Sequence, residues 1–327
     1  MSEILELLTL ISRLLHAENV LILCHKNPDG DTVGSSAALY HALKGLGKTA
    51  ALLCSDPIPA RYAYMQIELY TGQFEPGYVV AVDVAGIQLF GDGARPYSDR
   101  VDLCIDHHGS NSGYADAMYL DASAAATAEI IYQLLEAMQV PITPVIADCL
   151  YTGISTDTGC FLYNNTTAHT HKVAAALMEA GARVGELNAL LFESKSKGRI
   201  AIERTALENL EYYFDEQCAL IYMTREQIAA SGVSAAELEG VTGLPRKIEG
   251  VRVGVTLRQN PSGSYKVSIR TVKGVDACSI AKRLGGGGHE QAAGCELEGN
   301  LENAKAAVLA EVEKELARCA ESAGEDE

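Results

Sequence analysis

Eight acidic and histidine residues in the first half of the chain have side chains that could bind metal ions. They are His25, Asp29, Asp31, Asp83, Asp106, His107, His108 and Asp157. Placed together without cations, their carboxylates would repel one another and raise one another's pKa values. Oxygen ligands suit Mg²⁺ and Mn²⁺, and added imidazoles favour Mn²⁺. The set therefore predicts two divalent cations, with Asp83 and Asp157 as candidate bridges, of the kind that activates water for in-line phosphoryl displacement.

Each of these segments also fits a purely structural role. Asp29 and Asp31 flank a glycine and follow a proline, so they could be turn formers. Asp83 could cap a helix, and His107 could be an interior histidine with satisfied hydrogen bonds. Four such segments in one half of the chain are harder to attribute to turns. The metal-site interpretation is therefore favoured over the structural one.

The elements that must position these residues alternate between strand and helix patterns. Apolar runs of strand length occupy residues 20–24, 49–54, 78–82 and 101–105, and helical spacing occupies residues 32–47, 124–138 and 144–152. This alternation predicts a parallel α/β sheet, in which ligands collect at the carboxyl ends of strands. His25, Asp83 and Asp106 each directly follow one of these runs. Asp157 is expected in a turn that spans residues 153–159.

The second half of the chain has a different pattern. A polar, locally basic stretch around Ser194–Gly198 predicts a linker, which gives domains at residues 1–185 and 205–327 joined by residues 186–204. Strands are expected at 218–223, 251–257 and 265–271, and helices at 199–214, 276–284 and 301–319. Four glycines before His289 would let backbone N–H groups approach an anion, although a mobile hairpin is the alternative. A smaller α/β domain is predicted.

The composition limits the classes of function. Hydrophobic residues make up 48% and charged residues 21% of the 327 residues, as in ordinary globular proteins. The net charge of −17 disfavours tight nonspecific binding of duplex DNA, but bound cations would still admit a small anionic substrate. No apolar run is long enough to span a bilayer. The nine scattered cysteines form no CxxC pair, which indicates buried thiols in a reducing cytoplasm.

Five segments resemble, in the same order, the signature motifs of the DHH phosphoesterase superfamily and its associated C-terminal domain. They are residues 25–31, 82–83, 106–108, 155–159 and 285–294. Within the superfamily the chain resembles the bacterial nano-RNase and pAp phosphatase group, the bifunctional oligoribonucleases. The resemblance implies a parallel-sheet N-terminal domain with helices on both faces, a smaller C-terminal α/β domain and an active site in the cleft between them.

The resemblance also implies a role for each candidate residue at the metal site. One cation would be bound by His25, Asp29, Asp83 and Asp157. The other would be bound by Asp31, Asp83, His107 and Asp157. Asp106 would orient an imidazole, and His108 would contact the scissile phosphate or act as the general acid.

The C-terminal domain would supply the substrate contacts. Arg270 would bind a terminal phosphate with its planar guanidinium, and family members often carry serine at the next position, where Thr271 keeps the hydroxyl. The remaining contacts implied by the resemblance are Ser268, Gly287, Gly288 and His289.

The activity implied is hydrolysis of short oligonucleotides, from dinucleotides to pentanucleotides, to 5′-mononucleotides, or of pAp to AMP. A hydrolase of cyclic or linear signalling dinucleotides and a single-strand exonuclease are the alternatives within the same chemistry. From another class, the chain could be an inactive nucleotide-binding sensor, but the complete ligand set argues against that. The family is often dimeric, so a homodimer is also possible.

Overall fold

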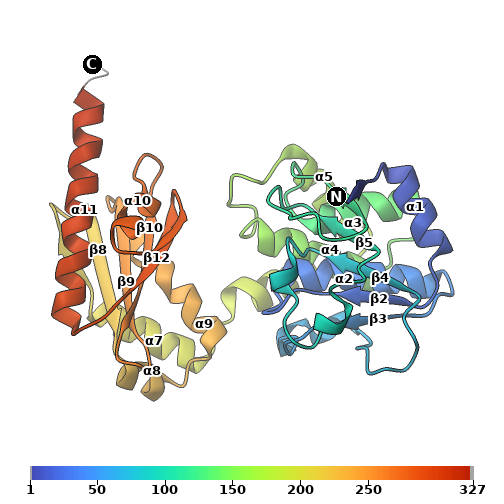
Figure 1. The fold of residues 1–327 in the computed structure, drawn as a ribbon, viewed down its shortest axis with the longest axis horizontal. Helices are drawn as coiled ribbons and strands as arrows, with labels where there is room; N and C mark the ends of the chain where they lie inside the picture. Colours follow the sequence, from blue (N-terminus) through green and yellow to red (C-terminus); the bar gives the residue numbers. More distant parts are fainter. Residues whose placement is uncertain (1, 325–327) are drawn as a thin grey trace. The chain divides into compact units, whose positions relative to one another are not determined.

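A computed structural model describes residues 2–324, in two compact units that divide between Ser194 and Lys195. Residues 325–327, at the end of the predicted second domain, lie outside the described residues. Figure 1 shows a sheet with associated helices in each unit. The α/β class predicted from the sequence is confirmed, and each unit is described by itself.

The sheet of the first unit has six strands, and every pair of neighbours is parallel. Its order is β1-β6-β5-β4-β2-β3. The strands are β1 (Glu3–Ile4), β2 (Val20–Leu23), β3 (Ala50–Leu53), β4 (Tyr78–Val82), β5 (Leu103–Asp106) and β6 (Ala117–Leu120). The short strands β1 and β6 were not predicted. The carboxyl ends of β2, β4 and β5 are neighbours at one edge, which is where the candidate ligands follow.

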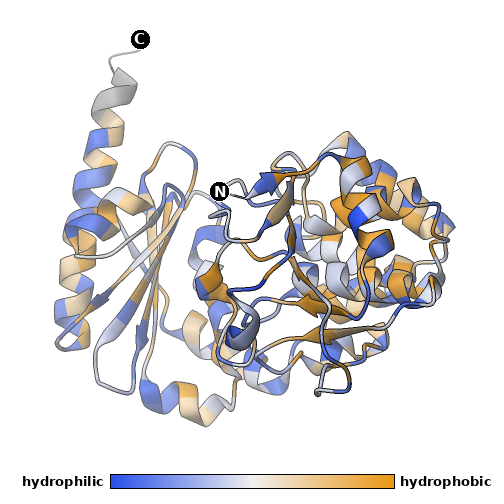
Figure 2. Ribbon diagram, turned by 45° about the vertical axis from the view of Figure 1, so that its right-hand side comes forward, coloured by the Kyte–Doolittle hydropathy of each residue, from blue (hydrophilic) through white to orange (hydrophobic). Residues whose placement is uncertain are grey.

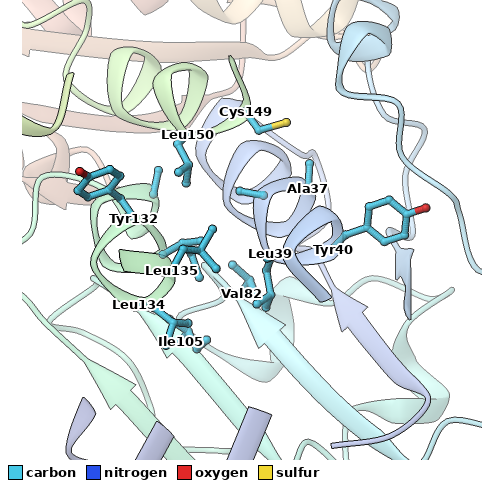
Figure 3. Packing of buried hydrophobic residues seen from close by; sticks show 14 of the residues in the cluster. Ala37, Leu39, Tyr40, Val82, Ile105, Tyr132, Leu134, Leu135, Cys149 and Leu150 are labelled. Carbon is cyan, nitrogen blue, oxygen red and sulfur yellow. The ribbon is translucent and has the colours of Figure 1, made fainter. Parts of the chain in front are cut away.

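Helices cover both faces of this sheet. On one face, α2 (Gly30–Gly45) and α3 (Thr127–Ala137) contact the strands. The helices α1 (Leu7–His16), α4 (Pro144–Asp157) and α5 (Ala168–Glu179) pack against α2 or α3 and extend the same hydrophobic core. Figure 3 shows Leu39 of α2 and Leu134 of α3 packing beside Val82 and Ile105 of the strands. The other face packs against the connection that carries the 3₁₀ helices η2 (Ile87–Leu89) and η3 (Arg95–Tyr97). Figure 2 shows hydrophobic residues along these strands.

The predicted turn around Asp157 was wrong, because α4 continues through Gly153 and ends at Asp157. Glycine usually weakens a helix interior. Here it is required by packing: a Cβ atom on Gly153 would lie 2.6 Å from Asp31 Oδ1 and 2.6 Å from Ala128 Cβ. A Cβ atom on Gly34 of α2 would likewise collide with the backbone carbonyl of Cys149. These glycines let α2 and α4 approach closely, which brings Asp31 and Asp157 together.

The sheet of the second unit is mixed, with the order β11-β12-β10-β9-β8-β7, and β8 and β9 are its one parallel pair among the described strands. The strands are β7 (Glu211–Tyr213), β8 (Cys218–Met223), β9 (Val253–Gln259), β10 (Tyr265–Thr271), β11 (Gly287–His289) and β12 (Ala292–Leu297). The helices α10 (Ala277–Arg283) and α11 (Leu301–Gly324) contribute Ile280, Val308 and Val312 to its core.

One prediction for this unit was wrong in detail. The helix expected at residues 199–214 is α7 (Lys197–Glu208), after which the chain forms β7, because β7 pairs with β8. The glycine-rich segment contributes β11, which pairs with β12. The remaining short helices are α6 (Val184–Asn188), the π-helix η4 (Ala189–Glu193), α8 (Arg225–Ser231), α9 (Ala235–Glu239), and the 3₁₀ helices η1 (Ala60–Met65), η5 (Gly240–Gly243) and η6 (Pro245–Lys247).

Within residues 2–324, no helix is both long and apolar enough to cross a membrane. Cys24, Cys104 and Cys149 are buried free thiols, as their apolar surroundings in the sequence predicted.

Candidate metal centre

The eight candidate residues of the first unit lie close together although they come from four segments of the sequence. His25 and Asp83 follow β2 and β4, and Asp106 ends β5 ahead of the two other histidines. Asp29 caps α2, Asp31 lies in its first turn, and Asp157 ends α4. Three groups have ligand atoms all within 4.8 Å of one another: His25, Asp29 and Asp83; Asp31, His107 and Asp157; and Asp83, His107 and His108.

The first group surrounds the ring of His25. Its Nε2 atom lies 3.5 Å from Asp29 Oδ2 and 3.8 Å from Asp83 Oδ2. Its Nδ1 atom lies 2.7 Å from the carbonyl of Lys26. Because a carbonyl can only accept, Nδ1 carries a proton, and the neutral form of the ring therefore has its lone pair on Nε2. That lone pair is directed toward two carboxylates, as in a ring prepared to bind a cation.

The second group repeats this arrangement around His107. Nδ1 donates to the carbonyl of Ala124 (3.2 Å), and Nε2 lies 3.4 Å from Asp157 Oδ2 and 3.8 Å from Asp83 Oδ1. Nε2 is buried and has no hydrogen-bond partner among the described residues. A buried nitrogen without a partner is costly. A divalent cation between this nitrogen and the acids would remove that cost, so the residues present fit a metal ion.

Asp83 belongs to two of the three groups and contacts all three histidines. Its two carboxylate oxygens point to different rings, Oδ2 to His25 and Oδ1 to His107 and His108. The residue is 3% exposed, and its backbone is left-handed, with φ of 61°. Aspartate adopts that conformation more readily than most residues, at some cost in strain. The two oxygens of Asp83 thus face two different histidine environments.

Asp106 is fully buried and holds the turn that carries the two histidines. Its Oδ1 accepts from the amides of His107 (2.8 Å) and His108 (3.2 Å) and from His108 Nδ1 (2.8 Å). Its Oδ2 accepts from the side-chain amide of Asn111 (2.6 Å). Asn111 was missed in the sequence because nothing in its spacing marks a partner for Asp106. Both oxygens of Asp106 are thus engaged in hydrogen bonds, and one of them accepts from the imidazole of His108.

The electrostatics of the metal-free site are those of crowded acids. Burial raises the pKa of Asp31 to about 7, and Asp157 adds to the shift. Burial likewise raises the pKa of Asp157 to about 6, with Asp29 contributing. Burial and then Asp31 hold the pKa of Asp83 well above its usual value. Bound cations would lower the pKa values of these three acids, because they stabilise the ionised carboxylates.

The remaining shifts follow from pairing with the imidazoles. Burial acts to raise the pKa of Asp29, but the hydrogen bond and charge interaction with His25, together with the amides of Thr32 and Asp31, leave the pKa lowered. The pKa of Asp106 is also lowered, because hydrogen bonds from His108 and Asn111 outweigh its burial. The hydrogen bond to Asp106 in turn raises the pKa of His108.

Four of the five predicted substrate residues of the second unit line one pocket of about 470 Å³. Ser268, Arg270, Gly287 and Gly288 are among its lining residues, whereas His289 is exposed on β11 and is not one of them. A Cβ atom on Gly288 (φ 146°) would lie 2.5 Å from Ala293 Cα, so the strand pair requires glycine there. The Arg270 guanidinium donates to the carbonyl of Ile269 (3.0 Å) and forms no ion pair within residues 2–324.

The sequence matches two family models that together span most of both units. Residues 19–154 match the DHH family, N-terminal domain, and residues 218–318 match the DHHA1 domain. The chain is 36% identical over 324 residues to the bifunctional oligoribonuclease and PAP phosphatase NrnA of Thermus thermophilus, covering 96% of this chain and 95% of that protein. The chain belongs to the DHH family of phosphoesterases. It is therefore a hydrolase of phosphoric ester bonds, and such enzymes depend on metal ions.

Further similarities agree with this assignment. The bifunctional oligoribonuclease and PAP phosphatase NrnA of Bacillus subtilis is 26% identical over 285 residues, covering 86% of this DHH-family chain and 90% of that protein. The crystal structure of an exopolyphosphatase-related protein from Bacteroides fragilis superposes with a TM-score of 0.83 at 24% identity. The superposition covers 94% of this chain and 95% of that one. It supports the assignment of the fold and carries no argument about function.

Proposed function

We propose that this DHH-family enzyme hydrolyses short oligonucleotides to 5′-mononucleotides and pAp to AMP at a site that holds two divalent cations. The supporting observation is the buried carboxylate of Asp83, whose oxygens Oδ2 and Oδ1 lie 3.8 Å from the rings of His25 and His107, respectively. The substrate class comes from the Thermus and Bacillus relatives, which are named oligoribonuclease and PAP phosphatase.

The ligand sets of the two cations follow from the two similar histidine environments. His25, Asp29, Asp83 and Asp157 would bind one cation, and Asp31, Asp83, His107 and Asp157 the other. In support, the atoms of three residues from each set already lie within 4.8 Å of one another. The imidazole in each set favours Mn²⁺ over Mg²⁺. Bound together, two such cations lower the pKa of water and neutralise charge on the phosphoryl group.

His108 would act on the substrate rather than on a cation. Its Nδ1 atom is already engaged by Asp106 at 2.8 Å, so the ring can offer only Nε2, and its side chain is 43% exposed. Asp106 stabilises the protonated ring, which suits a residue that binds the scissile phosphate or donates a proton to the leaving oxygen. Asp106 is thus a positioning residue for His108.

The second unit would bind the part of the nucleotide that does not react. The guanidinium of Arg270 is free of acidic partners in the described chain and borders the 470 Å³ pocket, so it could receive a terminal phosphate through two parallel hydrogen bonds. Ser268 and the backbone of Gly287 and Gly288 would complete this contact, together with His289. A cytoplasmic location, a homodimer and weak binding of duplex DNA stay predictions from the sequence.

The proposed activity is tested with labelled RNA dinucleotide, pentanucleotide and 24-mer, and with pAp, each incubated with the purified enzyme and Mn²⁺. A parallel incubation with EDTA removes the cations. We expect release of mononucleotide from the two short RNAs and of phosphate from pAp, slower turnover of the 24-mer and none with EDTA. Absence of turnover of every substrate in Mn²⁺ would contradict the proposal, and preference for the 24-mer would favour a processive exonuclease.

A further inference from the structure

Thr127, the first residue of α3, contacts two of the proposed metal ligands, which come from different elements. Its hydroxyl donates to Asp83 Oδ1 (2.9 Å), and its backbone amide donates to Asp31 Oδ2 (2.6 Å). Its side chain is fully buried. Thr127 carries no charge and lies far in the sequence from both acids, so its type and spacing gave no signal of this position.

The carboxylate of Asp31 is oriented through both of its oxygens. Oδ1 accepts from the hydroxyl of Ser35 (2.8 Å) and the amide of Ala128 (3.0 Å), and Oδ2 accepts from the amide of Thr127. Two of these three donors are backbone amides at the start of α3. A side-chain substitution at Thr127 would therefore leave the orientation of Asp31 largely intact.

Asp83 depends on Thr127 in a different way. The carboxylate of Asp83 contacts the three histidines. Apart from these contacts, the one hydrogen bond that it accepts within residues 2–324 comes from the hydroxyl of Thr127. The backbone of Asp83 is left-handed, so its side chain leaves the strand in a direction that the regular sheet does not fix. The hydroxyl is what fixes the plane of this carboxylate.

We infer that Thr127 is a positioning residue that sets the orientation of the Asp83 carboxylate, so that each of its two oxygens faces a different cation. The backbone amide of Thr127 holds the carboxylate of Asp31 in place next to Asp83. The inference rests on the proposed two-cation site. Thr127 itself touches neither substrate nor cation, and it acts by reducing the rotational freedom that Asp83 must lose on binding metal.

Three variants separate the hydroxyl from the bulk of the side chain. Thr127→Val keeps the shape and the amide but removes the hydroxyl, and Thr127→Ser keeps the hydroxyl. Thr256→Val is the matched control, because Thr256 is 1% exposed on β9 and its hydroxyl donates to the carbonyl of Thr242 (3.2 Å) in the second unit. Mn²⁺ affinity is measured by isothermal titration calorimetry, and the melting temperature of each metal-free variant is measured alongside.

Loss of an outer partner of a metal ligand typically weakens affinity by about 10- to 100-fold, and we expect that loss in Thr127→Val. Thr127→Ser should restore most of the affinity, and Thr256→Val should bind Mn²⁺ as the wild type does even if it melts at a lower temperature. At saturating Mn²⁺, Thr127→Val should lower kcat while KM for the dinucleotide stays near the wild-type value.

The possible results distinguish the inference from the proposed function. If Thr127→Val binds Mn²⁺ as tightly as the wild type, or if the Val and Ser variants lose Mn²⁺ affinity equally, the inferred role of the hydroxyl is wrong. The proposed two-cation site is not affected by either result. A wild-type protein that binds no Mn²⁺ would overturn the two-cation site and this inference together. If Thr127→Val does not fold, the comparison of Thr127→Ser with the wild type still decides, because the hydroxyl account requires Ser to retain the affinity.

Discussion

His107 Nε2 lies 3.4 Å from Asp157 Oδ2 at the meeting point of the turn after β5 and the end of α4. The nitrogen is buried and has no hydrogen-bond partner in the described chain, and the carboxylate has a raised pKa. Neither group is satisfied by the other alone. A cation between them would satisfy both. These contacts are the physical basis of the predictions that follow.

His108 should contribute to turnover but not to metal binding. We expect His108→Ala to lower kcat by about 10²- to 10⁴-fold, the range of general acid–base catalysis, while Mn²⁺ affinity stays within about threefold of the wild type. His107→Ala is the matched variant and should lose Mn²⁺ affinity. Calorimetry and steady-state kinetics on both variants check this. Equal loss of Mn²⁺ affinity in the two variants would show that His108 is a ligand.

Asp106→Asn tests how His108 is held in its protonated form. The hydrogen bond to Asp106 raises the pKa of His108, so removing the charge should lower that pKa. If His108 donates a proton, the alkaline limb of the kcat–pH profile moves to lower pH in Asp106→Asn. The profile is measured with dinucleotide at saturating Mn²⁺. An unchanged alkaline limb would assign that limb to another group.

The crowded carboxyls predict how stability depends on pH. In the metal-free protein the pKa values of Asp31 and Asp157 are raised to about 7 and about 6, from 3.8 in an unfolded chain. Folding then retains protons that unfolding releases, so the free energy of unfolding falls as pH rises from 3.8 to about 7. Cations replace these protons, so the rise in Tm caused by Mn²⁺ should be larger at pH 8 than at pH 5.

Thermal melts with and without Mn²⁺ across this pH range test the linkage. Asp31→Asn should flatten the pH dependence of the metal-free protein. Asp102→Asn is the control, because Asp102 accepts from the amide of Val79 (2.7 Å) outside the cluster, and it should keep the wild-type slope. A Tm increment that is the same at pH 5 and pH 8 would contradict the account.

Arg270 should determine the affinity for substrate rather than the rate of the chemical step. Hydrogen bonds to charged groups contribute about 1.5–3 kcal/mol, so Arg270→Ala should raise KM roughly 10- to 150-fold with kcat little changed. Arg270→Lys keeps the charge but loses the planar fork, and it should recover part of this affinity. Arg252→Ala, whose Nη1 donates to Gln217 Oε1 (3.0 Å), is the control. A loss confined to kcat would contradict the assignment.

The sequence predicted most of the first sheet and the eight clustered residues, for a clear physical reason. Continuous apolar runs mark buried strands, and parallel strands bring the residues that follow them to one edge. The short strands β1 and β6 were missed, because pairing rather than local propensity forms them. Asp157 was assigned to a turn because Gly153 looks like a helix breaker, and only the packing against Asp31 and Ala128 shows why glycine is required.

The outer partners of the ligands could not be predicted from the sequence. Thr127 and Asn111 are neutral residues whose importance depends on hydrogen bonds to acids on other elements. Thr127 lies at the start of a helix, where a threonine is ordinary. Such contacts become visible only when α3 is placed against β4 and α2.

The central claim is that Asp83 is shared by two cations, and a Mn²⁺ titration of wild type and Asp83→Asn tests it most directly. The stoichiometry is measured by calorimetry and by metal content after gel filtration, with Asp102→Asn as the control for loss of an acid elsewhere. The account predicts two Mn²⁺ per chain in the wild type and in the control, and loss of both in Asp83→Asn with loss of dinucleotide turnover. One tightly bound Mn²⁺ retained in Asp83→Asn, or undiminished turnover, would contradict it.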